Sequence, residues 1–376
     1  MENVIIGERL KEVREARKMT QEELSQKIGI TRSSISAFEK GFKFPSIQTV
    51  EKLSKELKIP MAYLQNERPP RSNRIGPLSY RKNSRTSQAV QDQMSRLEEW
   101  LEDIYSIYNT YIDFPEVNFL PAEPVDYEFL SDDDIEKTAD ELRAQWGMGL
   151  GPISNLTDFI EANGIVIGRA FLESDVDAVS VWRSRRPHIL INKTITSCAR
   201  IRMSIAHELG HLVLHRLVDE EDYEDKDKHE LMEKQASSFA GAFLFPRRSF
   251  YTEFRSTKLD ALLLMKERWK VSMGAIVMRA KIFELINKNN IRTFYDQLAL
   301  KGYSRKKEPL DDEIPLEPIK LFSEANQILA ENRINIQRII DETLLSKNDF
   351  YTITDIEPKF NEEKNVKIIQ FRRIDD

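Results

Sequence analysis

The sequence predicts a mostly helical α+β protein with more than one domain. Its 376 residues exceed the roughly 100–200 residues of a typical domain, and 40% of them are hydrophobic, enough for more than one core. Apolar residues recur at spacings of three and four along most of the chain, which is typical of helices. β-rich runs gather in the middle of the chain, at residues 165–171, 178–182 and 188–192.

Composition changes along the chain divide it into five parts. We expect a helical N-terminal domain over residues 1–65 and a basic, proline-containing linker over residues 66–91. A helical connector over residues 92–130 then leads into the larger domain, residues 131–305, which holds the sheet. The last part, residues 306–376, is acidic and punctuated by prolines, with a helical pattern from about residue 319 to residue 345; its role is unknown.

The charge is distributed unevenly between the two ends. The whole chain has a net charge of −6, but residues 1–91 hold 18 Lys and Arg against 10 Asp and Glu, a balance of +8, which leaves −14 for the remainder. A basic head on an acidic body is typical of a nucleic-acid-binding module joined to a separate effector domain. The alternative is chance unevenness.

Cysteine content and hydropathy indicate a cytoplasmic location. The single cysteine, Cys198, excludes a disulfide framework and fits a reducing compartment. We find no secretory signal in the first residues, and the longest stretch without a charge, residues 144–157, is too short to span a membrane. We therefore expect no membrane partner.

The first 65 residues show five short helical patterns, at about residues 6–18, 21–28, 32–40, 46–57 and 60–64. Thr20 with Glu23 forms a capping box, Gly29 ends the second helix, and Thr31 caps the third. Ile35 points inward from the third helix. Two short helices joined by a tight glycine turn predict a helix-turn-helix.

The segment MTQEELSQKIGITRSSISAFEKGFKFPSIQTVEKLSKEL within these residues resembles the phage-repressor-like (XRE/Cro) DNA-binding domain. The resemblance implies that Gln21 holds a phosphate and that Arg32, Ser33 and Ser36 face base edges in the major groove of a double-stranded operator. Of these, only Arg32 makes the bidentate guanine contact that strongly discriminates bases. The alternative is a small helical bundle that contacts protein.

Residues 66–111 connect this bundle to the body. The linker carries six basic residues against one acid and three prolines; its charge either touches DNA phosphates or is merely solvated. Apolar residues then recur with heptad-like spacing over residues 91–111, at Met94, Leu97, Leu101, Ile104, Tyr108 and Tyr111. Because the pattern lasts under three heptads, it favours packing on the protein's own body, with a homodimer helix as the alternative.

The larger domain begins with helical patterns at residues 132–146 and 153–162, followed by the three β-rich runs. We expect a small, antiparallel sheet. Next comes an amphipathic helix in which His207, Glu208 and His211 form the motif H-E-x-x-H. Residues four apart lie on one helical face, so both imidazoles converge on one Zn²⁺, while Glu208 reaches the water as general base. This pattern predicts hydrolysis of a peptide bond.

A third zinc ligand has to come from elsewhere. His215 lies eight residues after His207, rotated by about 80° and displaced by about 12 Å along the helix, and cannot reach the same ion. A second helical pattern downstream offers Glu230 and Glu233. Glu233 lies closer to the apolar face that Phe239 defines, and we favour it. For a transition-state stabiliser the sequence offers Tyr223, His229 and His188 without ranking them.

The segments RMSIAHELGHLVLH and EKQASSFAGAFLFP resemble the ImmA/IrrE family of bacterial metallo-endopeptidases over about residues 130–305. The resemblance implies a zincin-like, gluzincin-type domain in which His207, His211 and Glu233 are the zinc ligands and Glu208 the catalytic acid/base. It also implies a substrate of the helix-turn-helix repressor class. We expect a polypeptide substrate to add as a strand to the sheet edge, at residues 178–182.

Two hypotheses follow from the combined pattern. In the first, the protein is a DNA-binding transcriptional regulator and zinc endopeptidase that cleaves a repressor-type protein, or itself, to control gene expression. In the second, it is a non-proteolytic repressor or antitoxin-type regulator whose zincin fold acts as a sensor. Replacing Glu208 separates the two, because it removes the base and keeps the predicted ligands.

Overall fold

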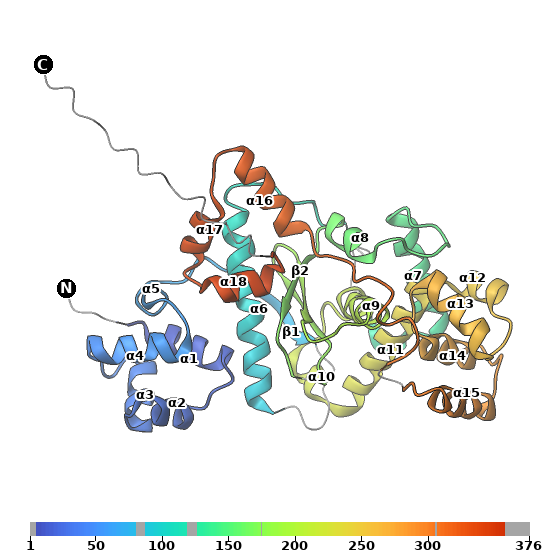
Figure 1. Cartoon of the computed structure of the whole chain (residues 1–376), viewed down its shortest axis with the longest axis horizontal. Coiled ribbons are helices and arrows are strands. Elements are labelled where there is room, and N and C mark those ends of the chain that lie inside the picture. Colours follow the sequence, from blue (N-terminus) through green and yellow to red (C-terminus); the bar gives the residue numbers. More distant parts are fainter. Residues whose placement is uncertain (1–4, 80–86, 119–125, 174, 305–306, 358–376) are drawn as a thin grey trace, which may run out of the picture.

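The computed structural model describes residues 5–79, 87–118, 126–173, 175–304 and 307–357 (Figure 1). Its helices are α1 (Gly7–Ala16), α2 (Gln21–Ile28), α3 (Arg32–Glu39), α4 (Ile47–Leu57), α5 (Met61–Gln65), α6 (Gln88–Tyr108), the 3-10 turn η1 (Tyr127–Phe129), α7 (Asp132–Gln145), α8 (Leu156–Ala162), α9 (Cys198–Leu214), α10 (Glu220–Glu224), α11 (Lys226–Leu244), α12 (Arg247–Glu253), α13 (Leu259–Trp269), α14 (Met273–Ile282), α15 (Lys288–Leu300), α16 (Leu321–Glu331), α17 (Ile336–Thr343) and α18 (Lys347–Thr354). Its strands are β1 (Arg74–Ser79), β2 (Val166–Ala170), β3 (Ala178–Arg183) and β4 (Pro187–Asn192). The predicted mostly helical α+β class is confirmed.

The five predicted N-terminal helices are present as α1 to α5. Glu23 donates its backbone N–H to the Thr20 side chain, and the Glu23 carboxylate accepts the N–H of Thr20, so the predicted capping box begins α2. Gly29 ends α2 in the left-handed region, with φ at +74°. Ile35 and Phe38 of α3 are buried in the bundle core. The outer face of α3 is therefore left for solvent or a partner.

The segment predicted as a linker contains a strand, and this part of the prediction is wrong. Residues 74–79 form β1, which pairs antiparallel with β3. Gly76 and Pro77 in its middle are typical of coil, which is why the sequence pattern favours a linker. An edge strand tolerates a proline, because its missing N–H faces away from the ladder, and β1 lies at the edge of the sheet. Residues 80–86 of the same segment lie outside the described residues.

Helix α6 lies between the N-terminal bundle and the sheet (Figure 1). Its heptad-like stripe is buried within this chain; Met94, Leu101 and Ile104 are fully covered, and Tyr111 beyond the helix is half-buried. On the bundle side, the indole N–H of Trp100 donates to the Tyr63 hydroxyl, at 2.9 Å. The predicted packing of this stripe on the protein's own body is confirmed.

The sheet has the strand order β1-β3-β4-β2 and is mixed rather than antiparallel. β3 and β4 are joined by a short hairpin and run antiparallel, but β2 pairs parallel with β4, in the register Val166 to His188. The antiparallel prediction fails because β2 and β3, although consecutive in sequence, are not neighbours. Strands β2, β3 and β4 are buried on both faces.

The two faces of the sheet are covered by different helices. Helix α9 packs on one face, with α11 beside it, and α6 and α18 pack on the other. Alternate side chains of β3 point to opposite faces of the sheet. Ser180 and Trp182 contact α9. Val179 and Val181 belong to the apolar cluster that α6 and α18 share. The sheet therefore connects the α9 face to the helix that carries the N-terminal bundle.

The C-terminal region packs back onto the molecule. Its predicted helical stretch is divided into α16 and α17, and α18 follows and packs against β2. Asp349 of α18 forms an ion pair with Arg17 after α1, at 2.7 Å, so this region also contacts the N-terminal bundle. Among the described helices, none combines the length and apolar character that a membrane span requires.

Candidate functional site

Helices α9 and α11 bring His207, His211 and Glu233 together. Their nearest donor atoms all lie within 4.8 Å of one another. The two Nε2 atoms are 3.1 Å apart, and each is 3.3 Å from an oxygen of Glu233. Glu230, the other predicted candidate, is exposed and forms an ion pair with Lys226, at 3.8 Å. The helical phase of α11 thus places the favoured glutamate opposite both imidazoles.

This donor set fits a metal ion. Two imidazole nitrogens and a carboxylate oxygen are the ligands of many zinc hydrolases. Glu233 Oε1 is buried and has no hydrogen-bond donor in suitable geometry among the described residues, as expected of an oxygen that faces a cation. Burial raises the pKa of Glu233, but the imidazole of His207, whose Nε2 lies 3.3 Å from Oε2, holds it well below its ordinary value.

A chain of hydrogen bonds behind His211 fixes the proton on its ring. The Gln235 amide donates to the carbonyl of Tyr127, at 2.6 Å, so its oxygen is left to accept from His215 Nε2, at 2.9 Å. Burial lowers the pKa of His215 to about 3, so its ring is neutral and its Nδ1 accepts. That Nδ1 lies 3.0 Å from His211 Nδ1, which therefore carries the proton. The lone pair of His211 is then on Nε2, toward Glu233.

Glu208 lies beside this cluster and is not part of it. Its side chain points to the sheet, where the Ser180 hydroxyl donates to Oε2 at 2.6 Å. The residue is only 3% exposed. Burial raises the pKa of its carboxyl to about 7. Glu208 follows His207 directly in α9, and one of its two carboxylate oxygens is held by Ser180. This geometry is suitable for a proton-transfer group.

Several of these residues were not found from the sequence. His215 lies outside the donor cluster, as its helical position predicts, but the sequence does not indicate its contact with His211. Ser180 and Gln235 carry no local motif, and their contacts depend on how β3 and α11 pack on α9. Ser237 of α11 also approaches His207 Nδ1, at 3.3 Å.

The three unranked candidates for a stabilising group are separated by the fold. His188 is buried on the α6 face of the sheet, with its ring nitrogens 3.0 Å from Glu98 and 3.4 Å from Glu102, away from the α9 face. The rings of Tyr223 and His229 contact each other edge to face, and His229 Nε2 lies 3.9 Å from Glu233. Only the latter pair is close to the donor cluster.

The predicted DNA-contact residues belong to α2 and α3 of the N-terminal bundle. Arg32 and Ser33 are exposed at the start of α3, and Ser36 is half-exposed one turn later. Gln21, at the start of α2, donates its amide to Glu39, at 2.8 Å. Glu39 is itself held by the guanidinium of Arg14, so this pairing ties α1, α2 and α3 together beneath the exposed face.

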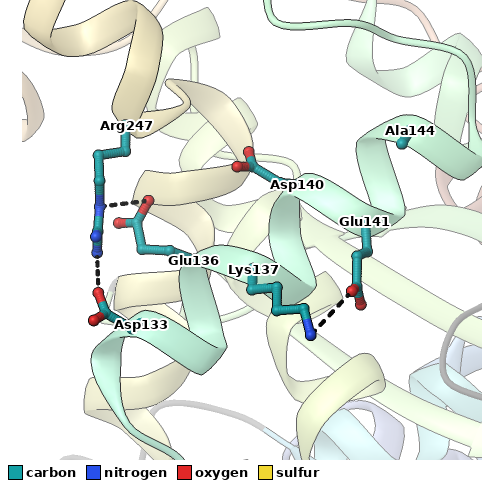
Figure 2. Close-up of a pocket in the computed structure, with 7 residues that line it drawn as sticks. All are labelled: Asp133, Glu136, Lys137, Asp140, Glu141, Ala144 and Arg247. Atoms are coloured by element: carbon teal, nitrogen blue, oxygen red, sulfur yellow. Dashed lines mark ion pairs between the residues drawn. The ribbon is translucent and has the colours of Figure 1, made fainter.

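A separate acidic pocket of about 420 Å³ lies on α7 and α12 (Figure 2). Arg247 of α12 forms an ion pair with Asp133 of α7, at 2.7 Å, and Lys137 pairs with Glu141 within α7, at 3.6 Å. None of its lining residues belongs to the donor cluster or to the helix-turn-helix face. We therefore treat it as a structural feature of the α7–α12 contact.

Comparison with known families divides the chain in the same way. Residues 160–281 match the family model of the IrrE N-terminal-like domain, which is a peptidase family, and residues 10–64 match a helix-turn-helix model. The chain therefore contains an XRE-like helix-turn-helix domain followed by an IrrE/ImmA-like domain, which confirms both resemblances seen in the sequence.

Two curated relatives are similar to the N-terminal part. The cryptic phage CTXphi transcriptional repressor RstR of Vibrio cholerae is 33% identical over 63 residues, which are 17% of this chain and 57% of the repressor. The uncharacterized HTH-type transcriptional regulator YqaE of Bacillus subtilis (strain 168) is 35% identical over 60 residues, 16% of this chain and 52% of that protein. The chain thus spans about half the length of the curated relatives it matches.

Among solved structures, a similarity is found to the competence regulator ComR from Streptococcus vestibularis in complex with its cognate signaling peptide XIP. The identity is 15%, and the match covers 88% of this chain and 98% of that one. The TM-score is 0.15, at which the likeness carries no argument.

Proposed function

We propose that the protein is a DNA-binding transcriptional regulator with zinc-dependent endopeptidase activity, which cleaves a repressor-type protein, or itself, to control gene expression. The observation that carries the proposal is the convergence of His207, His211 and Glu233 from two helices, with Glu208 fixed beside them. The match to a peptidase family and to a helix-turn-helix family in one chain supports the combination.

His207, His211 and Glu233 would hold the zinc ion. When bound, the ion supplies Lewis acidity, which lowers the pKa of water and polarises the peptide carbonyl. The contribution of the chain is to prepare the ligands before the metal arrives. His215 and Gln235 set the tautomer that leaves the lone pair of His211 on Nε2, toward Glu233.

Glu208 moves the proton in this mechanism. Ser180 donates to its Oε2, which leaves Oε1 to accept a proton from the attacking water. The same carboxyl then delivers that proton to the nitrogen of the leaving amine, so that the C–N bond breaks without releasing an amide anion. His229, 3.9 Å from Glu233, lies close enough to the cluster to assist the developing oxyanion by hydrogen bonding.

The N-terminal bundle would read the operator through α3. Arg32, which is exposed at the start of α3, would contact guanine through both guanidinium nitrogens, and Ser33 and Ser36 would contact neighbouring base edges. Gln21 at the start of α2 would hold a phosphate. Bundles of this class read paired half-sites, so we expect the protein to bind its operator as a homodimer.

A reporter gene placed behind the chain's own upstream region tests the proposal in cells. Cells producing wild-type protein and cells producing Glu208→Gln are compared under inducing conditions. Endopeptidase control predicts that induction is lost in the variant, although operator binding is retained. Unchanged induction would mean that the domain acts without proteolysis, as a ligand sensor. Glu230→Gln is the matched control, because that glutamate is exposed and outside the donor cluster.

A further inference from the structure

Strand β1 lies at the place on the sheet where a polypeptide substrate is expected to pair. A peptidase substrate has to be extended at the bond that is cut, and an extended chain can gain backbone hydrogen bonds by adding to a free strand edge. From the sequence, β3 is the expected edge. In the structure, β3 is covered on that side by β1, which itself forms the edge of the sheet.

The register of β1 brings it to the proton-transfer group. Ser79 lies opposite Ser180, the residue whose hydroxyl holds Glu208, and Ile75 lies opposite Trp182. Residues of β1 and of the C-terminal half of α9 together line a cavity of only about 10 Å³, so the two are closely packed. The α9 residues that line it include His211 and His215. β1 therefore covers the β3 edge next to the candidate metal centre.

Side chains of three β1 residues help to hold the strand in this place. Leu78, which is 7% exposed, belongs to the apolar cluster on the α6 face of the sheet, while Ile75 packs on the α9 side. The guanidinium of Arg74 donates to the Ser95 hydroxyl, at 2.9 Å, and lies 3.6 Å from Glu98. These contacts resemble the way a bound peptide is recognised: backbone pairing, apolar side chains in pockets, and one charged anchor.

The pairing of β1 with β3 is also irregular. Residues 75 and 79 of β1 align with residues 182 and 180 of β3, so extra residues bulge out between them. Gly76, with φ at +73°, and Pro77 form this bulge. A short, bulged strand with a proline has few ladder hydrogen bonds to lose. An incoming peptide without the bulge can therefore compete for the same edge.

We propose that β1 is an autoinhibitory strand that occupies the substrate position on β3. The inference rests on the proposed endopeptidase function and adds a regulation to it: the site is latent until an extended peptide displaces β1. The displacing partner is an extended segment with a basic residue in the place of Arg74 and apolar residues in the places of Ile75 and Leu78. Since β1 follows the DNA-binding bundle in the chain, its release alters the connection between that bundle and the body.

The test uses the full-length, zinc-loaded chain and a fluorescent peptide with the sequence of residues 72–79, SNRIGPLS. In the variant Leu78→Asp, a charge in the apolar cluster should release β1, whereas Leu78→Met keeps volume and hydrophobicity and serves as the matched control. Fluorescence anisotropy should show binding to Leu78→Asp at least tenfold tighter than to wild type or Leu78→Met. A peptide with Asp in place of the leucine should not bind.

Cleavage of labelled casein, measured in the same samples, separates this inference from the proposed function. We expect Leu78→Asp to cut at least tenfold faster than wild type. If every form cuts at the same rate and the peptide binds none preferentially, the chain is a peptidase and β1 is not inhibitory. If the peptide binds the variant tightly but no form cuts, β1 does cover a peptide site and the peptidase proposal fails.

A second variant tests the inference independently, in case Leu78→Asp does not fold. Replacing residues 74–79 by a Gly-Ser segment of equal length removes the strand without burying a charge. Circular dichroism and zinc content identify the folded variants before binding is measured. Hydrogen exchange should show faster exchange at β3 in either opened variant and renewed protection when SNRIGPLS is added. Unaltered exchange in a folded Gly-Ser variant would overturn the inference.

Discussion

The hydroxyl of Ser180 on β3 donates a hydrogen bond to Glu208 on α9, with the two oxygens 2.6 Å apart. This contact joins the middle of the sheet to the proposed general base. It fixes one carboxylate oxygen and leaves the other to take a proton. Because β3 also pairs with β1 and packs on α6 through its other face, the orientation of Glu208 depends on elements that lead to the DNA-binding bundle.

The first prediction concerns this hydrogen bond. In Ser180→Ala, Glu208 loses the donor that orients it and stabilises its charged form. We therefore expect kcat for casein cleavage to fall about tenfold, or about 1.4 kcal/mol in activation free energy. KM and zinc content should stay within twofold of wild type. Ser204→Ala, which changes a hydroxyl on α9 that bonds to its own helix, is the control. A loss of zinc in Ser180→Ala would assign the serine a structural role instead.

The second prediction concerns the hydrogen-bond chain behind His211. His215→Ala removes the acceptor that fixes the tautomer of His211, and loss of such an outer partner typically lowers metal affinity 10- to 100-fold. We expect zinc affinity, measured by competition with a fluorescent chelator, to fall by that factor. Gln235→Leu should also lower the zinc affinity. Equal zinc affinity in all three proteins would show that the tautomer is not set by this chain.

The third prediction concerns operator binding. Arg32→Ala should weaken binding of the operator by about 1–3 kcal/mol and relax the preference for guanine at one position. Arg32→Lys should recover charge but not specificity, because lysine lacks the bidentate geometry. Electrophoretic mobility shifts at several salt concentrations measure both effects. Arg292→Ala, an exposed arginine on α15, is the control; an equal loss there would indicate nonspecific electrostatics.

The fourth prediction concerns pH and stability. The buried carboxylate of Glu161 accepts the backbone N–H groups of Lys320 and Leu321, and burial raises its pKa to about 7 from an ordinary value of 4.5. The folded chain therefore holds this proton more tightly than the unfolded chain. The contribution of Glu161 to the free energy of unfolding is therefore fully present below pH 4.5 and is lost as the pH rises through about 7.

Thermal unfolding at pH 5 and pH 8 checks this sign. Wild type should lose roughly 1–3 kcal/mol over that interval through Glu161, and Glu161→Gln, which cannot ionise, should show a correspondingly smaller loss. Glu331→Gln, at the exposed end of α16, should follow the wild-type profile. A pH dependence that is identical in wild type and Glu161→Gln would rule out this group as its source.

Features that depend on near neighbours in the chain were predictable from the sequence. The capping box of Thr20 and Glu23 and the turn at Gly29 define the helix-turn-helix locally. His207 and His211 share a face because a helix repeats every 3.6 residues. The same periodicity indicates Glu233, because the apolar face of α11 determines which glutamate faces α9.

Features that depend on the pairing of distant segments were not predictable. β1 contains Gly76 and Pro77, and only the finished sheet edge shows why they are tolerated. The parallel pairing of β2 with β4 follows from strand order, which no local pattern encodes. The contacts of Ser180 with Glu208 and of Gln235 with His215 join elements that are separated by 28 and 20 residues.

The proposed function requires that the purified, zinc-loaded protein cleave a helix-turn-helix repressor or itself. Repressor proteins encoded beside the gene are incubated with wild type and with Glu208→Gln at equal zinc content, and intact mass spectrometry follows the products. We predict two new fragments of one repressor, or of the chain itself, with wild type and none with Glu208→Gln. Either of two results would contradict the proposed function. In the first, both proteins give identical product masses. In the second, every repressor and the chain itself stay intact, although wild type and the opened Gly-Ser variant are fully occupied by zinc.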